Sequence, residues 1–595
     1  MHFDDILVQY LGNFGRYQRR IYFLVCLPAI YCGVNIFCWT FVGADIPFRC
    51  KLGPNDTNYF QLPSGTASSS SLTGQNLSSF ITGKDLVMDN CKRFPNDSES
   101  CVDGYLWDNT ELLNSAAQDW ELVCHRTHLK AAVQSCFYVG MLLGCTIAGF
   151  LSDRFGRKVV LMVCSCCMSA VALTSAFSPS VEFYAILRLL QGALESGVFQ
   201  VPYILGIEQV GPSMRLIAGM VIQMFFTVGL IILGVSAYFI REWQHLQLAM
   251  ALPGFLFVSY FWLMPESARW LLAVGKKDEC MKLLRKAAKV NGVTIPDEAL
   301  EALQEDTEKS SGGEATSQHS WLDLVRTPNM RRNTIVSAYC WIIVTLIYYC
   351  ISVDPSAVAG DFYMSFILAG VMELPAMLIV TLLLKFIGRR TLQAGCFCVT
   401  GCATLALIAT PHQGVAAIVL MLVCKSAITG SFCVIYIYTS EIFPTVVRNL
   451  GLGTCSTFGR IGAIISPFAA LSLSNHNRLT LLLTLGSSAI LASLLTIILP
   501  ETANQLLPET LEDGENFGKC WLCFWTAQKD QNNNTGTATG QDSVNKYTNC
   551  LLTTNSAKQP VVVEELLSSP MNIDELPCKD PSYHLSSEEA TSLVP

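Results

Sequence analysis

The sequence predicts an all-α membrane protein with twelve transmembrane helices in two six-helix halves and a large extracellular loop between the first two helices. Of its 595 residues, 51% are hydrophobic and only 14% are charged, whereas soluble domains carry about 25% charged residues. Apolar runs of about 20 residues, the length that crosses a hydrocarbon core roughly 30 Å thick, recur along the chain. A basic motif also follows both the second and the eighth run, which indicates two related halves.

The twelve expected helices share this length and a nearly uncharged composition. They span residues 21–43, 131–151, 159–177, 183–207, 217–240, 246–264, 334–353, 362–384, 392–410, 414–438, 452–473 and 479–499. Helices 2–6 thus occupy residues 131–264, and helices 7–12 occupy residues 334–499. The first run has no A-x-A-like cleavage site, so we interpret it as a retained helix and not as a signal peptide.

Lysine and arginine mark the expected cytoplasmic side, because short cytoplasmic loops are enriched in them. The segments DRFGRK (153–158), MRR (330–332) and KFIGRR (385–390) fall on one side of the bundle, together with the N-terminal residues 1–20. Both termini are therefore expected in the cytoplasm, and the plasma membrane is the expected location of this multi-pass protein.

The first loop, residues 44–130, is polar and has the features of an extracellular segment. It contains three N-x-S/T glycosylation patterns, which begin at Asn55, Asn76 and Asn96. It also contains four cysteines, Cys50, Cys91, Cys101 and Cys124. An even number of cysteines in an oxidising compartment predicts two disulfides, for which three pairings are possible. A single glycosylation pattern is often unused, but three patterns in one loop favour a glycosylated loop.

Two further polar segments lie on the expected cytoplasmic side. Residues 265–333 contain KDECMKLLRKAAKV and PDEALEALQEDTEK, whose periodicity predicts short amphipathic helices that link the two halves. Residues 500–595 form a tail whose polar composition predicts disorder over most of its length. The net charge of −8 argues against a nucleic-acid partner.

Several motifs resemble those of known transporters. GFLSDRFGRK (149–158) resembles the loop signature of the major facilitator superfamily, G-x-L-x-D-R-x-G-R-R/K, and LLLKFIGRRTLQA repeats part of it six helices later. PESARWLL, RLLQG, YTSEIFPTVVRN, PETANQLLPETLEDGE and NFGRYQRR resemble segments of the organic ion transporter family, solute carrier family 22. The resemblance covers residues 1–515 and is nearest to the carnitine/organic cation branch. It implies the major facilitator fold.

The resemblance also implies residues that control conformation. They are Asp153, Arg154, Arg157, Arg188, Glu195, Lys385, Arg389, Glu441 and Arg448. Asp153 is expected to cap a helix or to pair across the halves. The alternative is that the motif is an ordinary basic loop without such a role. Arg188 is equally compatible with a structural charge pair, and Glu195 and Lys425 are each candidates for one half of an internal ion pair.

Arg460 carries a permanent charge inside an apolar run, which costs about 2.5–3.5 kcal/mol on insertion scales. In the family that the chain resembles, organic cation members carry aspartate at this position, whereas organic anion and carnitine members carry arginine. A guanidinium can bind a carboxylate through two parallel hydrogen bonds, so we expect it to bind a substrate carboxylate or chloride; a structural ion pair with Glu373 is the alternative. The neighbours Gly459 and Gly462 leave room for a ligand or permit tight helix packing.

Glu373 lies beside Pro375, which can open the helix locally. The carboxylate is a candidate cation site or else a structural partner of Arg460 or Lys425. Aromatic candidates for the same site are Trp341, Tyr348, Tyr349, Tyr203 and Phe199. Aromatic faces attract quaternary ammonium groups within about 6 Å, although packing and an interfacial belt explain any single aromatic residue as well.

These features predict a secondary transporter of small organic ions, most simply carnitine or a related zwitterion or organic cation, that works by alternating access. An organic anion transporter and a non-transporting receptor or sensor on the same fold are the alternatives. The sequence contains no Walker A motif and no nucleophile–base or metal constellation, so we expect no enzyme, no metal and no cofactor beyond a coupling ion, Na⁺ or H⁺. Expected partners are the organic ion and the bilayer, with the protein a monomer or a weak homo-oligomer.

Overall fold

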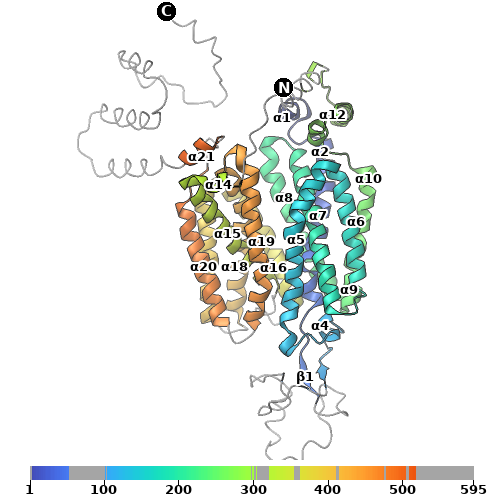
Figure 1. Cartoon of the computed structure of the whole chain (residues 1–595), viewed down its shortest axis with the longest axis vertical. Coiled ribbons are helices and arrows are strands. Elements are labelled where there is room, and N and C mark those ends of the chain that lie inside the picture. The colour runs from blue at the N-terminus through green and yellow to red at the C-terminus, as the bar shows by residue number, and fades with distance from the viewer. Residues whose placement is uncertain are drawn as a thin grey trace, which may run out of the picture. The chain divides into compact units, whose positions relative to one another are not determined.

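The computed structural model describes residues 3–51, 91, 101, 104–110, 112–296, 298–299, 303, 321–353, 362–410, 414–474, 478–503, 505, 508 and 510–517. Within them the chain forms twelve helical segments long enough to span a bilayer, which confirms the predicted fold class. Figure 1 shows the helices of each half grouped side by side, with the first half in blue to green and the second in olive to orange.

The first half consists of residues up to 263. Its helices are α2 (Arg16–Val42), α5 (His128–Phe155), α6 (Arg157–Ser175), α7 (Val181–Glu208), α8 (Arg215–Phe239) and a sixth segment made of α9 (Trp243–Ala251), the 3₁₀ helix η5 (Leu252–Ser259) and α10 (Tyr260–Leu263). The sixth segment changes to a 3₁₀ helix at Pro253, because proline has no N–H group for the α-helical hydrogen bond.

The second half repeats the arrangement. Its helices are α15 (Pro328–Val353), α16 (Phe362–Leu383), α17 (Arg389–Ala406) with its extension η7 (Leu407–Ala409), α18 (Val415–Ile442), α19 (Arg448–Ser474) and α20 (Arg478–Ile498). Ten of the twelve segments are apolar enough to qualify as membrane spans on composition. The remaining two are α7 and α19, which carry the internal charges Arg188, Glu195 and Arg460.

Several helices begin before the positions expected from the sequence. The expected starts were residues 21, 334 and 452, whereas α2, α15 and α19 begin at Arg16, Pro328 and Arg448. The additional turns carry charged or polar residues that continue the helix beyond the apolar run. A hydropathy pattern finds the edge of the hydrocarbon layer, not the end of the helix.

One end of the bundle, here called the linker end, carries short helices. They are α1 (Phe3–Ile6), the π-helix η1 (Leu7–Leu11), α11 (Ala268–Ala273), α12 (Lys277–Asn291), α14 (Asp323–Arg326) and α21 (Leu511–Asn516). α12 confirms an amphipathic helix in the linker, with Cys280, Met281 and Leu284 buried on one face. The second linker helix expected from the sequence lies mostly outside the described residues.

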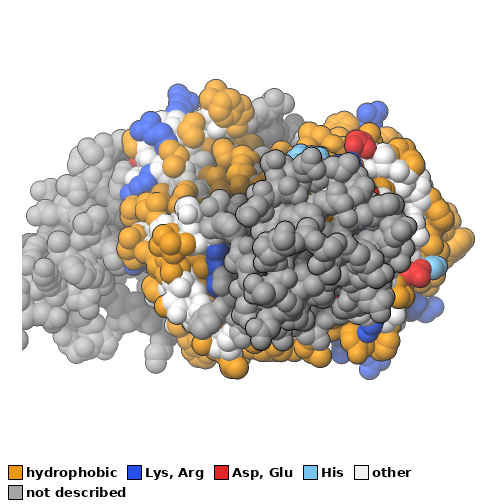
Figure 2. Space-filling model, turned by 90° about the horizontal axis from the view of Figure 1, so that it is seen from below, with side chains coloured by type: hydrophobic (Ala, Val, Ile, Leu, Met, Phe, Trp, Pro, Cys, Tyr) orange, Lys and Arg blue, Asp and Glu red, His pale blue; other side chains and the backbone are white. Residues whose placement is uncertain are grey.

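The opposite end, here called the ribbon end, carries a feature that the all-α prediction missed. Strands β1 (Phe48–Cys50) and β2 (Tyr105–Trp107) pair antiparallel, with Phe48 opposite Trp107, and are followed by α4 (Ala116–Asp119) and the 3₁₀ turn η3 (Cys124–Arg126). Hydrophobic side chains dominate the flanks of the bundle that are visible from this end (Figure 2).

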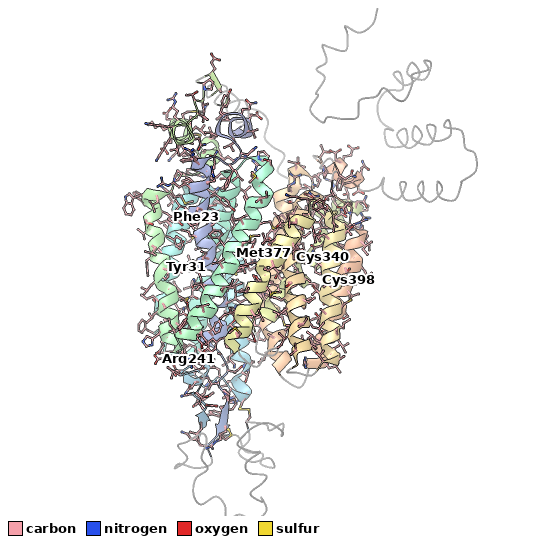
Figure 3. The ribbon with its side chains drawn as sticks, turned by 180° about the vertical axis from the view of Figure 1, so that it is seen from behind. Phe23, Tyr31, Arg241, Cys340, Met377 and Cys398 are labelled. Atoms are coloured by element: carbon pink, nitrogen blue, oxygen red, sulfur yellow. A yellow bond between two sulfur atoms is a disulfide. The ribbon has the colours of Figure 1, made fainter. Side chains whose placement is uncertain are left out.

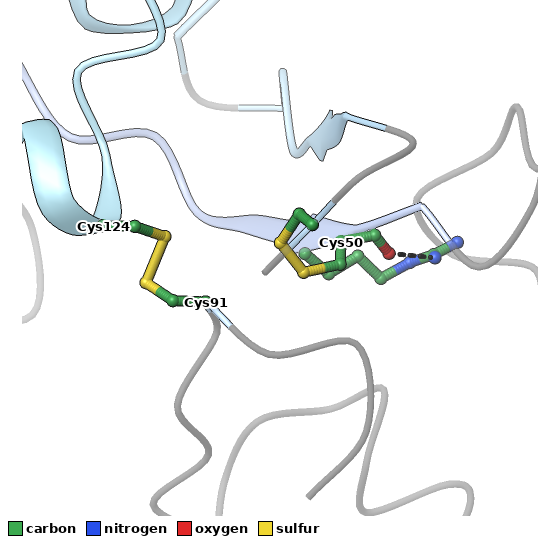
Figure 4. The surroundings of a disulfide bond; sticks show 5 residues. Cys50, Cys91 and Cys124 are labelled. Carbon is green, nitrogen blue, oxygen red and sulfur yellow. Dashed lines mark hydrogen bonds between the residues drawn. A yellow bond between two sulfur atoms is a disulfide. The ribbon is translucent and has the colours of Figure 1, made fainter. Parts of the chain in front are cut away.

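Two disulfides hold the ribbon end together, as the four cysteines of this loop predicted. Cys50 pairs with Cys101 and Cys91 pairs with Cys124, with Cα–Cα distances of 5.1 and 5.6 Å (Figure 4). The first pair lies at the end of β1, and the second ties the loop to the start of α5. The glycosylation patterns at Asn55, Asn76 and Asn96 lie outside the described residues.

Aromatic side chains join the two halves near the ribbon end. The Phe41 ring of α2 lies 4.9 Å from Phe366 of α16 and stacks on Tyr363 at 5.7 Å. Nearer the middle, the Phe37 ring lies 5.9 Å from Tyr349 of α15. Burial of these rings stabilises the closed contact, and aromatic pairs add about 0.5–1.5 kcal/mol each beyond their area.

Candidate functional site

Arg460 lies in the middle of α19, where three other helices approach it. Cys145 of α5, Tyr349 of α15 and Tyr436 of α18 all lie close enough to interact electrostatically with its guanidinium. The side chain is half-buried, and no carboxylate of the described residues lies within ion-pair distance of it. Arg460 therefore has neutral neighbours and keeps the capacity to bind an anion.

The small residues beside Arg460 serve helix packing. A Cβ atom at Gly462 would lie 2.3 Å from the Ile342 carbonyl oxygen of α15, and one at Gly459 would lie 3.0 Å from the Trp341 ring. Thr345 fixes this contact by donating a hydrogen bond of 2.6 Å to the Gly459 carbonyl. Of the two interpretations given by the sequence, tight packing of α19 on α15 is the one observed at these glycines.

Glu373 of α16 forms an ion pair with Lys425 of α18, one of the partners that the sequence left open. The Lys425 ammonium lies 2.8 Å from Glu373 Oε1, and both side chains are buried. Glu373 Oε2 accepts hydrogen bonds from Thr227 of α8 at 3.0 Å and from Tyr348 at 3.4 Å. Because Thr227 belongs to the first half, this carboxylate also connects the halves.

Two consecutive tyrosines of α15 join the charged groups. Tyr348 bonds to Glu373, and its ring centroid lies 3.6 Å from the Lys425 ammonium, a cation–π contact. Tyr349 lies within electrostatic range of Arg460, and its ring packs 4.8 Å from the Tyr138 ring of α5. The ion pair and the unpaired arginine therefore lie on the two sides of one short aromatic segment.

Trp341 is buried about two helical turns before these tyrosines on α15. Its indole N–H donates a 3.0 Å hydrogen bond to Thr439, and its ring lies 4.6 Å from the Tyr436 ring, edge to face. Trp341 thus contributes to the aromatic wall through its ring while its polar atom is occupied.

Phe432 and Tyr436 of α18 complete this wall, and the sequence analysis did not single them out. Phe432 lies 5.4 Å from Tyr348 and 5.7 Å from Tyr436. The signal was present, since residues 425, 432 and 436 follow one another at spacings of seven and four and so share one helical face with Lys425.

Tyr203 and Phe199 lie one turn apart in the part of α7 nearer the linker end. Their rings stack at 6.4 Å, and Phe199 meets the Phe226 ring of α8 at 5.8 Å. Tyr203 lies within electrostatic range of Tyr436 and Cys433. Neither ring contacts Arg460 or Glu373, so the structure does not bring these two predicted residues into direct contact with the charged groups of the site.

Arg188 is held by neutral groups of the first half. Its guanidinium donates to the Asn35 carbonyl at 3.1 Å and to Gln134 at 2.9 Å, and it lies 4.2 Å from the Phe137 ring. Glu195, seven residues further on, lies near Cys32 and in the field of Arg188 and Arg460, but forms no ion pair with a described residue. Both side chains are buried, so Arg188, Glu195 and Arg460 are three ionisable side chains that contact no oppositely charged partner among the described residues.

The remaining residues with a predicted role in conformation lie at the linker end. Arg157 pairs with Asp153 at 2.7 Å and with Glu208 at 3.2 Å, and Arg389 pairs with Glu441 at 3.2 Å. Each pair lies within one half. The expectation that Asp153 pairs across the halves is therefore not met in this structure. Arg448 donates to the Phe443 carbonyl, whereas Arg154 and Lys385 are exposed.

Comparison with known proteins places this arrangement in a family. The family model described as "Sugar (and other) transporter" matches residues 77–513. An organic cation transporter protein of Drosophila melanogaster is 39% identical over 526 residues, which cover 87% of this chain and 95% of the relative. Solute carrier family 22 member 21 of Mus musculus is 32% identical, with 87% and 94% covered. The chain belongs to the sugar (and other) transporter family and, within it, to solute carrier family 22.

Other similarities agree with this placement. The organic cation/carnitine transporter 2 of Homo sapiens is 32% identical over 529 residues, covering 85% of this chain and 93% of the relative. The inward-open structure of the xylose transporter XylE from E. coli matches with a TM-score of 0.56 and 15% identity, over 84% of this chain and 99% of that one. The structural match shows the major facilitator fold alone, and the sequence matches make this member of solute carrier family 22 a multi-pass membrane transporter.

Proposed function

We propose that this solute carrier family 22 member carries carnitine or a similar small zwitterion across the plasma membrane by alternating access. The observation that supports this most directly is Arg460, a half-buried guanidinium at mid-membrane with neutral neighbours. A buried charge is expensive unless it is paired. A travelling carboxylate would supply the missing partner through a bidentate interaction.

The aromatic wall supplies a place for the other end of the substrate. Tyr348 contacts Glu373, the adjacent Tyr349 lies near Arg460, and Tyr436 packs against Trp341. A quaternary ammonium group bound there would gain about 0.5–2 kcal/mol from the ring faces. It would compete with Lys425, which now occupies both Glu373 and the Tyr348 ring. Glu373 is thus proposed as a cation site that Lys425 holds while substrate is absent.

The proposed direction of transport follows from the charges at the two ends. The linker end carries the basic loops and is assigned to the cytoplasm by the positive-inside rule. The disulfide-bonded ribbon end is then extracellular, as an oxidising compartment requires. Aromatic contacts close the ribbon end in this structure, so substrate would leave toward the linker end.

Uptake into cells that express the chain tests the proposal. We expect Arg460→Asp to lower carnitine uptake by roughly tenfold to a hundredfold, the equivalent of a lost charge-assisted hydrogen-bond pair. Arg460→Lys should keep part of the activity, because one charge remains without the bidentate geometry. Arg478→Asp is the matched control, since it makes the same replacement at the first residue of α20, away from the site. Unchanged carnitine uptake by Arg460→Asp would refute the carboxylate role.

Organic anion transport is the second candidate, and the Glu373–Lys425 pair favours it. That pair neutralises Glu373 and leaves Arg460 as the dominant charge near the wall. The same cells should therefore be given a simple dicarboxylate and a simple quaternary cation. Uptake of the dicarboxylate without carnitine would establish the anion transporter, and surface expression with no uptake of any of the three would establish a receptor. Repeating the assay without Na⁺ and at a lower pH identifies the coupling ion.

A further inference from the structure

The structure contains a cavity that lies apart from the site between the halves. It has a volume of about 280 Å³ and opens on the outer side of α2 and α8, near the linker end. From α2 it is lined by Arg19, Tyr22, Phe23 and Cys26. Its walls are almost entirely apolar apart from the arginine at its edge, and its volume is below the roughly 300–1,000 Å³ of sites for drug-sized ligands.

The walls on α8 show that the cavity faces the lipid. Ile217, Val221 and Phe225 line it at spacings of four residues, and the same face continues with Ile232 and Phe239, both exposed. Thr227, which bonds to Glu373 of the other half, lies two residues beyond Phe225, or about 200° around the helix. The cavity therefore opens away from the second half of the protein.

The opposite wall has the same orientation. Phe23 is 55% exposed and lies in the part of α2 nearer the linker end (Figure 3). Arg16, Arg19 and Arg20 are exposed on the turns that lead to it, and none of them forms an ion pair with a described residue. From residue 19 to residue 26 the helix rises about 10 Å, which is most of one leaflet of a hydrocarbon core roughly 30 Å thick.

The closed bottom of the cavity is built by contacts between the two helices. The Tyr22 hydroxyl donates a hydrogen bond of 2.5 Å to the Ala218 carbonyl of α8. Further along, a Cβ atom at Gly33 would lie 2.2 Å from the Phe226 carbonyl oxygen, so the helices touch there. α2 and α8 are thus in contact toward the middle of the membrane and diverge toward the linker end, which leaves a wedge-shaped space.

We infer that this space, bounded by Arg19, Phe23 and Val221, is a binding site for an anionic phospholipid of the leaflet at the linker end. The apolar walls would take part of an acyl chain, and Arg19 would bind the phosphate or carboxylate of the headgroup. Arg16 and Arg20 add positive potential at the same level, which attracts an anionic lipid surface. A free soluble anion would gain nothing from the apolar walls, so the occupant is a lipid.

Binding of individual lipids to the purified full-length chain, measured by native mass spectrometry, tests this site. The probes are phosphatidylserine, phosphatidylcholine and glycerophosphoserine, which has the headgroup without acyl chains. Wild type should bind phosphatidylserine more tightly than phosphatidylcholine, and glycerophosphoserine should fail to compete. Arg19→Gln should weaken phosphatidylserine binding at least tenfold, since a charge-assisted contact is lost.

Two further variants separate a site from a general surface attraction. Arg20→Gln removes the same charge one residue away without lining the cavity, so its effect should not exceed about fivefold. Val221→Trp fills the cavity and keeps every arginine, and should weaken both phospholipids. Equal losses for Arg19→Gln and Arg20→Gln would overturn the proposal. So would competition by glycerophosphoserine, or unchanged phosphatidylserine binding by Val221→Trp.

Discussion

Each half of the molecule carries a charged cluster at the linker end, and the two clusters share a set of matching contacts. In the first half Arg157 pairs with Glu208 at 3.2 Å, and Ser267 donates to the same carboxylate at 2.5 Å. In the second half Arg389 pairs with Glu441 at 3.2 Å, and Thr502 donates to it at 2.5 Å. The serine and the threonine each follow a Pro-Glu pair, at residues 265–266 and 500–501.

The glutamates of these Pro-Glu pairs also correspond. Glu266 accepts a hydrogen bond from the Lys158 backbone N–H at 3.1 Å, and Glu501 accepts one from the Arg390 N–H at 3.5 Å. Each glutamate therefore caps the first turn of the helix that follows the basic loop, α6 or α17, where a negative charge is favourable. The internal repeat thus extends beyond the basic motif to the ends of both halves.

The clusters differ in how the chain enters them. α5 continues to Phe155 and reverses at Gly156, which has φ +103°, whereas α16 ends at Leu383 and reaches Gly388 at φ −60° after a four-residue turn. Asp153 in the last turn of α5 gives Arg157 a second carboxylate, and Lys385 stands at the corresponding position in the second half. Each cluster ties together helices of its own half, which favours motion of the halves as units.

The largest expected difference between the clusters concerns their glycines. Gly156→Ala should lower the free energy of unfolding by about 2–3 kcal/mol, because alanine is strained at this positive φ and its Cβ would lie 2.5 Å from Glu266. Gly388→Ala should cost about 1 kcal/mol, since only Glu501 must move and weaken a hydrogen bond. Thermal unfolding midpoints of the two purified variants measure this, and equal losses would show that the backbone conformation of Gly156 contributes nothing.

The arginines of the two clusters should differ less. Arg157→Gln leaves Glu208 with Ser267 alone, and Arg389→Gln leaves Glu441 with Thr502 alone. Each should cost about 1–2 kcal/mol, below the cost of breaking a fully buried pair because solvent reaches these side chains. Exchanging the charges, as in Arg389→Glu with Glu441→Arg, should restore part of the midpoint. If the unfolding midpoint falls in the single variants and does not recover when the charges are exchanged in either half, pairing is not the cause of the loss.

The fold was predictable because each helix shows itself in a local run of apolar residues. Charges inside such runs also identified Arg460, Glu373 and Lys425 one helix at a time. The pairing of Glu373 with Lys425 was not predictable, since it depends on how α16 and α18 face each other. The same holds for the approach of Cys145 to Arg460, which brings together helices more than 300 residues apart in the chain.

Two other features were present in the sequence and were missed for different reasons. The repeat of Pro-Glu-Ser-Ala at 265–268 as Pro-Glu-Thr-Ala at 500–503 is visible, but only the structure shows that both copies make the same contacts. The ribbon of β1 and β2 has three residues per strand, too short for a period-two pattern to be recognised.

The Glu266 carboxyl should give the first cluster a distinctive pH dependence. Burial raises the pKa of Glu266 above its ordinary value, so the folded state favours the neutral form. This carboxyl therefore costs no stability below its unfolded pKa, and the cost grows as the pH rises through the folded pKa. We expect the unfolding midpoint of Glu266→Gln, relative to that of wild type, to be higher at neutral pH than at acid pH. A midpoint difference from wild type that is constant with pH would contradict this, and Glu501→Gln is the matched variant in the other half.

The smallest expected effect concerns Asp153, the acid that only the first cluster has. Glu208→Gln leaves Arg157 paired with Asp153, whereas Glu441→Gln leaves Arg389 with no acid from the pairs described. Because the Asp153 side chain is 69% exposed, its pair should be worth about 0.2–1 kcal/mol and be screened by salt. Glu441→Gln should therefore lower the unfolding midpoint slightly more than Glu208→Gln at low salt. Adding Asp153→Asn to Glu208→Gln should remove the difference between the two midpoints. If the difference persists in the double variant, it comes from the backbones of the two clusters and not from their charges.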